Sequence, residues 1–312
     1  MFKCKVSVGI LSDPGRKRKN NEDSCLVYEP KDKLTCRTMG RLYAVADGIG
    51  GLAAGEIASR VAVERLKDYY YAAGQSNPPQ QALQQAVLAA HESIRRQAST
   101  TPKFAGMGST LTAAAVIDQE VYIAHVGDSR AYLIRDNKIA LLTSDHTVVA
   151  GLVQKGEITP EQAKTHPQRH KLNRSLGGRK QPDVDLITCS LNIGDTLVLC
   201  SDGLHDLVSD REIKNIVTSI RNPQRAAELL IKLANERGGR DNITVILIKI
   251  SGSVKLLQAA VIVLFLTLII CGGWFYFNRD LKKERIHETL SKLCTKVNSF
   301  GRNLITNVSS NS

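Results

Sequence analysis

The sequence lacks the cysteine patterns of disulfide-bonded and zinc-binding proteins. Its seven cysteines are scattered along 312 residues, and no two of them form a C-x-x-C pair. An odd number of scattered cysteines predicts reduced thiols in a cytosolic compartment, not a disulfide framework or a zinc site. The first residues, Met1 to Val6, do not have the layout of a signal peptide. We therefore expect the folded part of the chain to lie in the cytoplasm.

Two common motifs of enzyme sites are absent as well. No G-x-S-x-G surrounds Ser201, so a serine nucleophile of the hydrolase type is not expected. The glycines of Gly48-Ile49-Gly50-Gly51 do not belong to a G-x-G-x-x-G sequence in a strand–helix–strand unit. A dinucleotide-binding enzyme is therefore disfavoured.

The positive charge also lacks the pattern of a nucleic-acid-binding protein. The chain has a net charge of +12, and residues 1–250 carry +7 of it, from 34 basic and 27 acidic side chains. Apart from Arg16-Lys17-Arg18-Lys19, no dense basic run with interleaved aromatic residues occurs. We expect no nucleic-acid partner, because attraction to phosphorylated or otherwise anionic proteins explains the surplus equally well.

Short apolar and β-branched runs, separated by tight turns, fill most of residues 1–250. Strands are predicted at 2–11, 24–28, 41–46, 111–117, 121–126, 131–135, 138–142, 183–188, 195–200 and 243–250, and helices at 56–71, after Pro78-Pro79, at 210–219 and at 223–237. Strands and helices do not alternate, so a doubly wound parallel sheet is not expected. The order predicts an α+β fold, an antiparallel β-sandwich with helices outside.

The region 144–182 is more polar and richer in loops than its surroundings. Within it, Thr159-Pro160-Glu161-Gln162 predicts a helix start, with Thr159 as N-cap, Pro160 at the first helical position and Gln162 at the third.

Residues 256–277 follow a short linker, 251–255, and contain no charged side chain. A run of 22 such residues is long enough to cross a bilayer, and Trp274, Phe275 and Tyr276 gather at one end of it. We expect a transmembrane helix here. The basic tail, 278–312, has apolar residues at alternating steps of four and three from Ile286 to Leu304. Weak self-association as a coiled coil and an amphipathic helix on the membrane surface both fit this spacing.

Acidic side chains recur beside the ends of the predicted strands. They are Glu22, Asp23, Asp47, Asp202 and Asp241. Strand ends can converge at one edge of a sandwich, and oxygen ligands suit hard cations such as Mg²⁺ or Mn²⁺. Without a cation, carboxylates buried together would repel and raise one another's pKa. Two such ions sharing a carboxylate can lower the pKa of a water molecule and neutralise phosphoryl oxygens, and Arg18 has the donor geometry to hold a phosphate.

With these residues in place, the sequence resembles the metal-dependent Ser/Thr protein phosphatases of type 2C, in their bacterial form, from about Val6 to Ile250. Nine blocks occur in the order of that family. They are Arg18-Lys19-Asn20-Asn21-Glu22-Asp23, Ala46-Asp47-Gly48-Ile49-Gly50-Gly51, Gly55-Glu56-Ile57-Ala58-Ser59, Met107-Gly108-Ser109-Thr110, Gly127-Asp128-Ser129-Arg130, Asp145-His146, His166-Pro167-Gln168-Arg169, Ser201-Asp202-Gly203-Leu204 and Asp241-Asn242-Ile243-Thr244.

The resemblance implies a catalytic domain over residues 1–250 that hydrolyses phosphoserine and phosphothreonine with two Mn²⁺ or Mg²⁺ ions. It also implies two antiparallel sheets packed face to face between helix pairs (α-β-β-α), with 144–182 as a flap beside the site. Asp47 would bridge both metals. The resemblance places Glu22 and the Gly48 carbonyl on one metal, Asp202 and Asp241 on the other, Asp23 beside metal-bound water and Arg18 on the substrate phosphate.

The sequence departs from the family pattern at two positions. Family members with a third metal carry an acid shortly before the Met-Gly-Ser/Thr-Thr block, but residues 93–107 hold none, and Thr101 stands about where it would be. A third metal is therefore doubtful. Animal members have a histidine where this chain has Ile49, so His166 in the flap is the candidate to assist the leaving group. We expect Asp128 to belong to a structural turn between strands.

Partners and location follow from this resemblance as expectations. Phosphorylated proteins, substrates of a Ser/Thr kinase, are the expected partners, and a catalytically weak phosphoprotein-binding scaffold on the membrane is the alternative. A phosphatase for anti-sigma-factor antagonists is a further option within the family. We expect a single-pass protein of the inner membrane with a cytoplasmic catalytic domain, although basic residues near the span are more numerous on the tail side.

Overall fold

A computed structural model of the chain describes residues 4–50, 54–74, 76–252, 261–274, 276, 288–293 and 295–296. The chain divides into two units, residues 1–252 and 253–312. The first unit contains both β-sheets and all of the candidate site residues.

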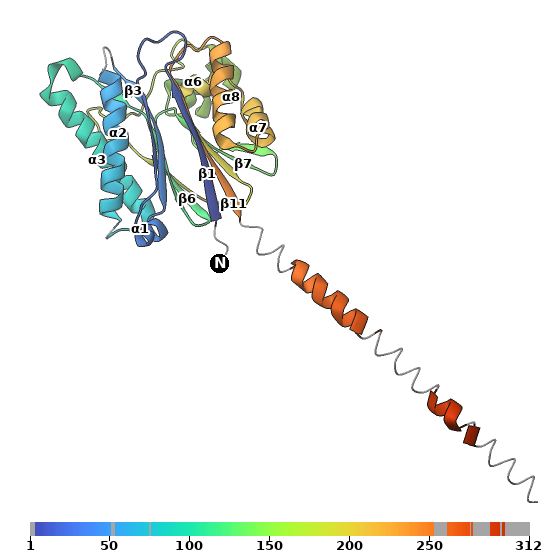
Figure 1. The fold of residues 1–312 in the computed structure, drawn as a ribbon. Helices are drawn as coiled ribbons and strands as arrows, with labels where there is room; N and C mark the ends of the chain where they lie inside the picture. The colour runs from blue at the N-terminus through green and yellow to red at the C-terminus, as the bar shows by residue number, and fades with distance from the viewer. Residues whose placement is uncertain are drawn as a thin grey trace, which may run out of the picture. The chain divides into compact units, whose positions relative to one another are not determined.

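Two antiparallel sheets form the centre of the first unit (Figure 1). One sheet has the strand order β1-β11-β10-β7-β8, with β1 at Cys4–Asp13, β11 at Ile243–Gly252, β10 at Thr196–Cys200, β7 at Arg130–Arg135 and β8 at Lys138–Leu141. The other has the order β2-β3-β5-β6-β9, with β2 at Asp23–Tyr28, β3 at Arg41–Ile49, β5 at Leu111–Ile117, β6 at Glu120–Val126 and β9 at Asp185–Ser190, and β4 at Gly108–Ser109 pairs with the end of β3.

Helices cover the outer face of each sheet, which gives the α-β-β-α layers in Figure 1. On one side lie α2 (Ala54–Ala73) and α3 (Pro79–Thr100), and on the other α7 (Asp210–Ser219) and α8 (Pro223–Glu236). Short helices fill the connections: α1 (Lys33–Thr38), the 3₁₀-helix η1 (Pro102–Phe104), α4 (Val148–Gln154), α5 (Pro160–Thr165) and α6 (Asp202–His205).

The side chains of β3 explain how one strand serves two cores. Leu42, Ala44 and Ala46 pack with the residues of α2 and α3, whereas Tyr43 and Val45 pack between the two sheets. Alternate residues of a strand point to opposite faces, so a strand that is covered on both sides is apolar throughout. The long hydrophobic run before Asp47 follows from this burial on both faces.

The same alternation occurs in β11 of the other sheet. Val245 and Leu247 pack with residues of α7 and α8, and Ile246, Ile248 and Ile250 pack between the sheets. Three layers of core therefore fix the positions of the strands, and the loops at the strand ends carry the polar side chains.

The predicted α+β sandwich of two antiparallel sheets is confirmed. Most of the predicted elements lie within two or three residues of the observed ones, and α7 begins and ends where its helix was predicted. Thr159 and Gln162 form the predicted capping box at the start of α5, with Pro160 at its first position. The sequence analysis did not predict α1, which lies between β2 and β3.

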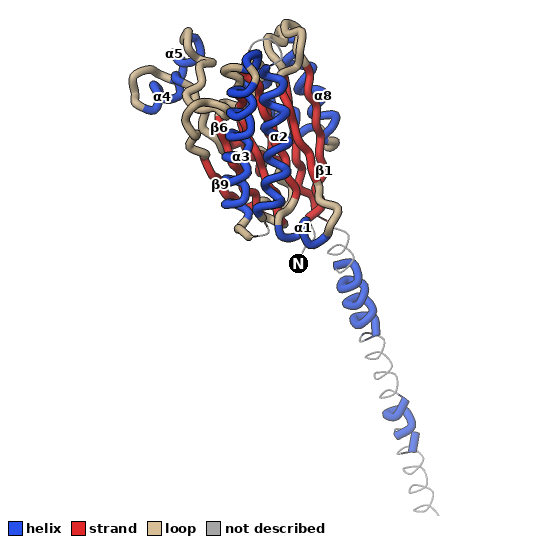
Figure 2. Tube along the Cα trace, turned by 90° about the vertical axis from the view of Figure 1, so that its left-hand side faces the viewer, coloured by secondary structure: helices blue, strands red, loops and turns tan. Residues whose placement is uncertain are grey.

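In Figure 2, α4 and α5 lie to one side of the sandwich, and both belong to the flap 144–182. The C-terminal part of the flap is bound to the sandwich by hydrogen bonds. Leu176 exchanges two backbone hydrogen bonds with Ser109, and the Gly177 N–H donates to Nδ1 of the buried His91 in α3.

The second unit has a helix over residues 261–274 and helical residues at 276, 288–293 and 295–296. Among the residues that the structure describes, no helix is both long and apolar enough to cross a membrane. Residues 256–260, 275 and 277 of the predicted span lie outside the described residues, as does most of the tail 278–312. The transmembrane part of the sequence prediction is therefore not confirmed.

Candidate metal centre

The end of β3 brings two of the predicted acids together. Asp23 opens β2 and is paired in the sheet register with Asp47 of β3. Asp47 is held through its backbone, because its N–H donates to Thr110 Oγ1 at 2.9 Å and its carbonyl accepts from Thr110 N at 2.8 Å. The backbone therefore fixes Asp47 while none of these bonds uses its carboxylate.

Glu22 and Gly48 lie side by side where the chain enters α2. The Gly48 N–H donates to the Glu22 carbonyl at 3.1 Å. A Cβ on Gly48 would collide with the Gly55 carbonyl, and a Cβ on Gly55 would lie 2.6 Å from Glu22 Oε2. Only glycine fits at these two positions, so their role is to let the Glu22 carboxylate and the strand end approach closely.

Asp23 is buried in a polar pocket between the sheets. Its Oδ2 accepts hydrogen bonds from Ser201 Oγ and Thr244 Oγ1, both at 2.7 Å, while Oδ1 is buried without a partner. Burial, together with the nearby charges of Asp202 and Asp241, raises the pKa of Asp23 to about 7 against the lowering effect of the two hydroxyls.

The carboxyl groups of Asp47 and Asp202 also have raised pKa values. Burial raises the pKa of Asp47 well above its ordinary value, and the carboxylates of Asp23, Asp202 and Asp128 raise it further. Burial also raises the pKa of Asp202, at the first position of α6, and its Oδ1 is buried without a hydrogen-bond partner. The carboxylates therefore converge without a donor set from the protein that would satisfy them.

Asp241 completes the cluster from the loop before β11. Its Oδ2 accepts from Arg18 Nη2 at 2.8 Å, in an ion pair whose side chains are 55% and 37% exposed. The neighbouring Asn242 binds the loop 14–22 at three points: its Oδ1 accepts from Glu22 N, and its Nδ2 donates to the carbonyls of Pro14 and Asn20. The loop that carries Arg18 and Glu22 is thereby held against the loop that carries Asp241.

Six predicted site residues, Glu22, Asp23, Asp47, Gly48, Asp202 and Asp241, therefore converge at one end of the sandwich, with Arg18 at the rim. The donor set consists of carboxylate and carbonyl oxygens, which suits Mg²⁺ and Mn²⁺. Two of the carboxylates also have a buried oxygen without a partner. The residues fit a pair of hard divalent cations.

Asp128 is an additional acid that the sequence analysis assigned to a turn. It is 7% exposed, and burial together with the charge of Asp202 raises its pKa to about 7. It follows a buried strand and a glycine, a strand-end position similar to those of Asp47 and Asp202, and this signal could have identified it. Asp128 is a further oxygen donor beside Asp202. It does not occupy the position of Thr101, where the family pattern would place an acid for a third metal.

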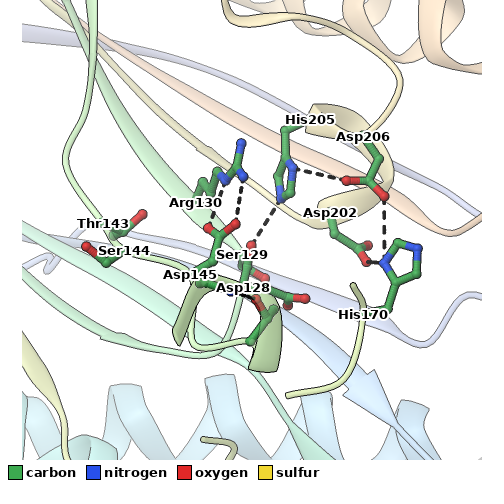
Figure 3. A network of polar contacts seen from close by, with 12 residues as sticks. Asp128, Ser129, Arg130, Thr143, Ser144, Asp145, His170, Asp202, His205 and Asp206 are labelled. Atoms are coloured by element: carbon green, nitrogen blue, oxygen red, sulfur yellow. Dashed lines mark hydrogen bonds and ion pairs between the residues drawn. The ribbon is translucent and has the colours of Figure 1, made fainter. Parts of the chain in front are cut away.

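Figure 3 shows a network of charged side chains around Asp202. His170 of the flap has its Nδ1 at 3.8 Å from Asp202 Oδ2 and 3.7 Å from Asp206 Oδ2. The buried His205 contacts Asp206 Oδ1 at 3.5 Å through Nδ1 and the Asp128 carbonyl at 3.0 Å through Nε2. This contact links α6 to the loop of Asp128.

His166, the predicted flap histidine, makes a local contact instead. It is the C-cap residue of α5, and its Nδ1 accepts a hydrogen bond from Gln168 N at 3.1 Å. Among the described residues, the flap histidine that reaches the acidic cluster is His170, four positions further along the chain. The sequence analysis missed His170.

Comparison with known proteins identifies the family of the chain. Residues 12–150 and 170–243 match the family Protein phosphatase 2C. The serine/threonine phosphatase stp of Listeria innocua is 39% identical over 241 residues, which cover 76% of this chain and 93% of that protein.

Solved structures are similar over the same part of the chain. The Mycobacterium tuberculosis serine/threonine phosphatase PstP/Ppp has a TM-score of 0.69 at 38% identity, covering 79% of this chain and 99% of that one. A structure of the catalytic domain of PstP in complex with two manganese ions has a TM-score of 0.68 at 36% identity, covering 80% and 99%.

Proposed function

Because the chain belongs to the protein phosphatase 2C family, we propose that its acidic cluster is the active site of a protein-serine/threonine phosphatase. The enzyme is metal-dependent and uses two Mn²⁺ or Mg²⁺ ions to hydrolyse phosphoserine and phosphothreonine in proteins. The observation that supports this most directly is the pair of buried, unpartnered oxygens, Asp23 Oδ1 and Asp202 Oδ1, in carboxylates that raise one another's pKa.

The proposed ligands divide into two sets that share Asp47. Glu22 and the Gly48 carbonyl would hold one ion, and Asp202 and Asp241 would hold the other. When bound, the two cations lower the pKa of a water molecule and neutralise phosphoryl oxygens during in-line displacement. The close approach of Glu22 to Gly55 and Gly48 is the structural support for the first set.

Asp23 and Arg18 have supporting roles in this proposal. Ser201 and Thr244 orient the Asp23 carboxylate by holding Oδ2, so that Oδ1 is free to accept a hydrogen bond from water. Arg18 pairs with Asp241 through one nitrogen and is otherwise exposed, so its remaining donors can hold the phosphate oxygens of a substrate. His166 would assist the leaving group only if the flap rearranged, since its ring makes a local bond.

Phosphate release from a phosphothreonine peptide tests the proposed activity. We expect hydrolysis with Mn²⁺, none in EDTA, and recovery when Mn²⁺ is added back. Asp202→Asn should lose both activity and Mn²⁺ affinity by calorimetry, while Arg18→Ala should raise KM and bind Mn²⁺ normally. A chain that binds the phosphopeptide but releases no phosphate under any of these conditions would be the scaffold, not the enzyme.

We further propose that residues 256–277 cross the inner membrane and leave the catalytic unit in the cytoplasm. Support comes from the uncharged 22-residue run and from the scattered cysteines, which suit a reducing compartment. The tail 278–312 would then lie outside, where its heptad spacing suits either weak self-association or binding along the lipid surface. Alkaline phosphatase fused after Ser312 should be active in the periplasm, and a fusion after Gly252 should not. Activity of the second fusion alone would reverse the orientation.

A further inference from the structure

The net positive charge of residues 1–250 comes from two segments. The loop 14–22 and the flap 144–182 together contain eleven basic and four acidic residues, a net charge of +7. All other residues of 1–250 contain 23 basic and 23 acidic side chains, which cancel. The whole surplus of the catalytic unit therefore belongs to these two segments, which are far apart in the sequence.

Both segments border the acidic cluster. The backbone N–H groups of Arg16 and Lys17 donate to the Gly239 carbonyl, at 2.7 and 3.2 Å, so the loop 14–22 lies beside the Asp241 loop. On the flap, Arg169 and Lys171 flank His170, whose ring contacts Asp202 and Asp206 (Figure 3). Basic residues thus lie beside the active site on two sides.

Most of these cations have no counter-charge in the protein. Arg18 pairs with Asp241 and Arg174 pairs with Asp185. Arg16, Lys17, Lys19, Arg169 and Lys171 are exposed, and within the described residues none of them has a carboxylate within 4.0 Å. Their charges are available to a bound molecule.

The phosphate of a substrate accounts for only part of this charge. It occupies the cluster and Arg18 in the proposed mechanism, so the unpaired cations that flank Arg18 and His170 in the sequence are left for the parts of the substrate on either side of the phosphorylated residue. Unpaired charges of one sign beside a site attract ligands of the opposite sign and speed their association. A nearly neutral remainder of the unit makes this attraction local to the mouth.

We propose that this enzyme selects phosphoproteins in which acidic residues flank the phosphorylated serine or threonine, and that Lys17, Lys19, Arg169 and Lys171 determine this preference. The inference rests on the proposed phosphatase function and adds the substrate class. These four residues contact the substrate chain outside the phosphate, so they affect KM and the rate of association more than kcat.

Three phosphothreonine peptides, identical except for aspartate, alanine or lysine at the flanking positions, test the preference with the full chain and Mn²⁺. We expect kcat/KM for the acidic peptide to exceed that for the neutral one by about tenfold at low salt, and the lysine peptide to be the poorest. The difference should shrink at ~1 M salt, where the Debye length is about 3 Å. Hydrolysis of none of the peptides would contradict the proposed function, whereas equal hydrolysis of all three would overturn only the preference.

Matched charge reversals locate the effect. Lys17→Glu with Lys19→Glu, or Arg169→Glu with Lys171→Glu, should remove most of the advantage of the acidic peptide and leave hydrolysis of p-nitrophenyl phosphate unchanged. Lys31→Glu with Lys33→Glu is the control, because both lysines are exposed, have the same spacing and lie at α1, before β3 begins, whereas the cluster lies where β3 ends. The control should behave as the wild type.

Two results would overturn the inference. The first is an equal loss of acidic preference in the control pair, which would make the effect one of total charge. The second is an unchanged peptide preference in the site variants together with lost binding to phosphatidylglycerol vesicles, which would mean that the basic segments bind lipid and not substrate.

Discussion

Buried carboxylates in this protein occur in two different settings. Asp145 is 20% exposed and is paired with Arg130, whose Nε and Nη2 donate to its two oxygens at 2.8 and 2.6 Å. Burial raises the pKa of Asp145, but the hydrogen bonds and charge of Arg130 lower it more, so it lies below its ordinary value. In the acidic cluster, burial acts on Asp23, Asp47 and Asp202 without such a partner, and their pKa values are raised.

The difference is the source of the positive charge. Asp145 obtains it from within the fold, as does Asp195, which accepts from Arg135 Nη2 at 2.7 Å. Among the described residues, the cluster has the half-exposed Arg18 at its rim and the exposed His170 of the flap, whose Nδ1 lies 3.8 Å from Asp202 Oδ2, but no largely buried arginine. A buried carboxylate without a cation is costly to the folded state, so it persists where a cation from solution or a reaction requires it. We therefore expect the paired acids to contribute to stability and the unpaired acids to activity.

The largest expected effect is on Asp47, the acid between both ligand sets. Asp47→Asn should lower kcat/KM by roughly 1,000-fold, about 4 kcal/mol, because it removes the charge that both cations share. In EDTA the same variant should be more heat-stable than the wild type, since one of the mutually repelling carboxylates is gone. Differential scanning calorimetry and phosphate release measure the two effects. Lower stability of the metal-free variant would mean that Asp47 is a structural acid like Asp145.

Replacement of Arg130 should lower the stability of the protein, in contrast to replacement of Asp47. Arg130→Met leaves Asp145 half-buried without its partner, and loss of one member of such a pair costs about 3 kcal/mol of unfolding free energy. For a unit of this size, Tm should fall by roughly 6–12 °C. Arg237→Met is the matched control, because Arg237 also forms a two-pronged pair, with Glu212, but at the surface, where solvent screens the charges and we expect a much smaller fall in Tm. Equal shifts in the two variants would remove the distinction between the settings.

Local sequence patterns predicted the fold and most of the acidic cluster because both depend on strand ends. The apolar run before Asp47 and the strand before Ser201 are recognisable from periodicity, and the acids that follow them lie at one edge once the sheets pack. Asp128 was not assigned to the cluster from the sequence, because Gly127-Asp128-Ser129 has the composition of an ordinary turn. Its burial beside Asp202 results from the packing of the two sheets, which composition does not reveal.

The flap was harder to predict for a related reason. The capping box of Thr159 and Gln162 is local, so it could be read from four residues. Which histidine reaches the cluster depends on the path of the chain after α5, and this path is set by contacts with residues distant in sequence, such as Ser109 and His91. The family resemblance indicated His166, whereas the tertiary contacts place His170 at Asp202.

The smallest expected effect concerns His125, a buried histidine whose two ring nitrogens both have hydrogen-bond partners. Its Nε2 lies 3.0 Å from the Ser144 carbonyl and its Nδ1 2.9 Å from Thr112 Oγ1. Burial, with the nearby His146, lowers the pKa of His125 from its ordinary value to about 4. Because the unfolded chain takes up this proton near pH 6.5 and the folded chain does not, the stability that neutral His125 provides is complete above pH 6.5 and is lost as pH falls toward 4.

His125→Asn should therefore change the pH dependence of folding and not only its magnitude. Between pH 7 and pH 5, we expect the wild type to lose about 2 kcal/mol of unfolding free energy relative to the variant, because only the wild type has this group to protonate on unfolding. Urea unfolding of both proteins at the two pH values gives the difference, and titrations that they share, including those of the acidic cluster, cancel in the comparison. A wild-type minus variant difference that is the same at pH 7 and pH 5 would show that His125 is not held neutral by the fold.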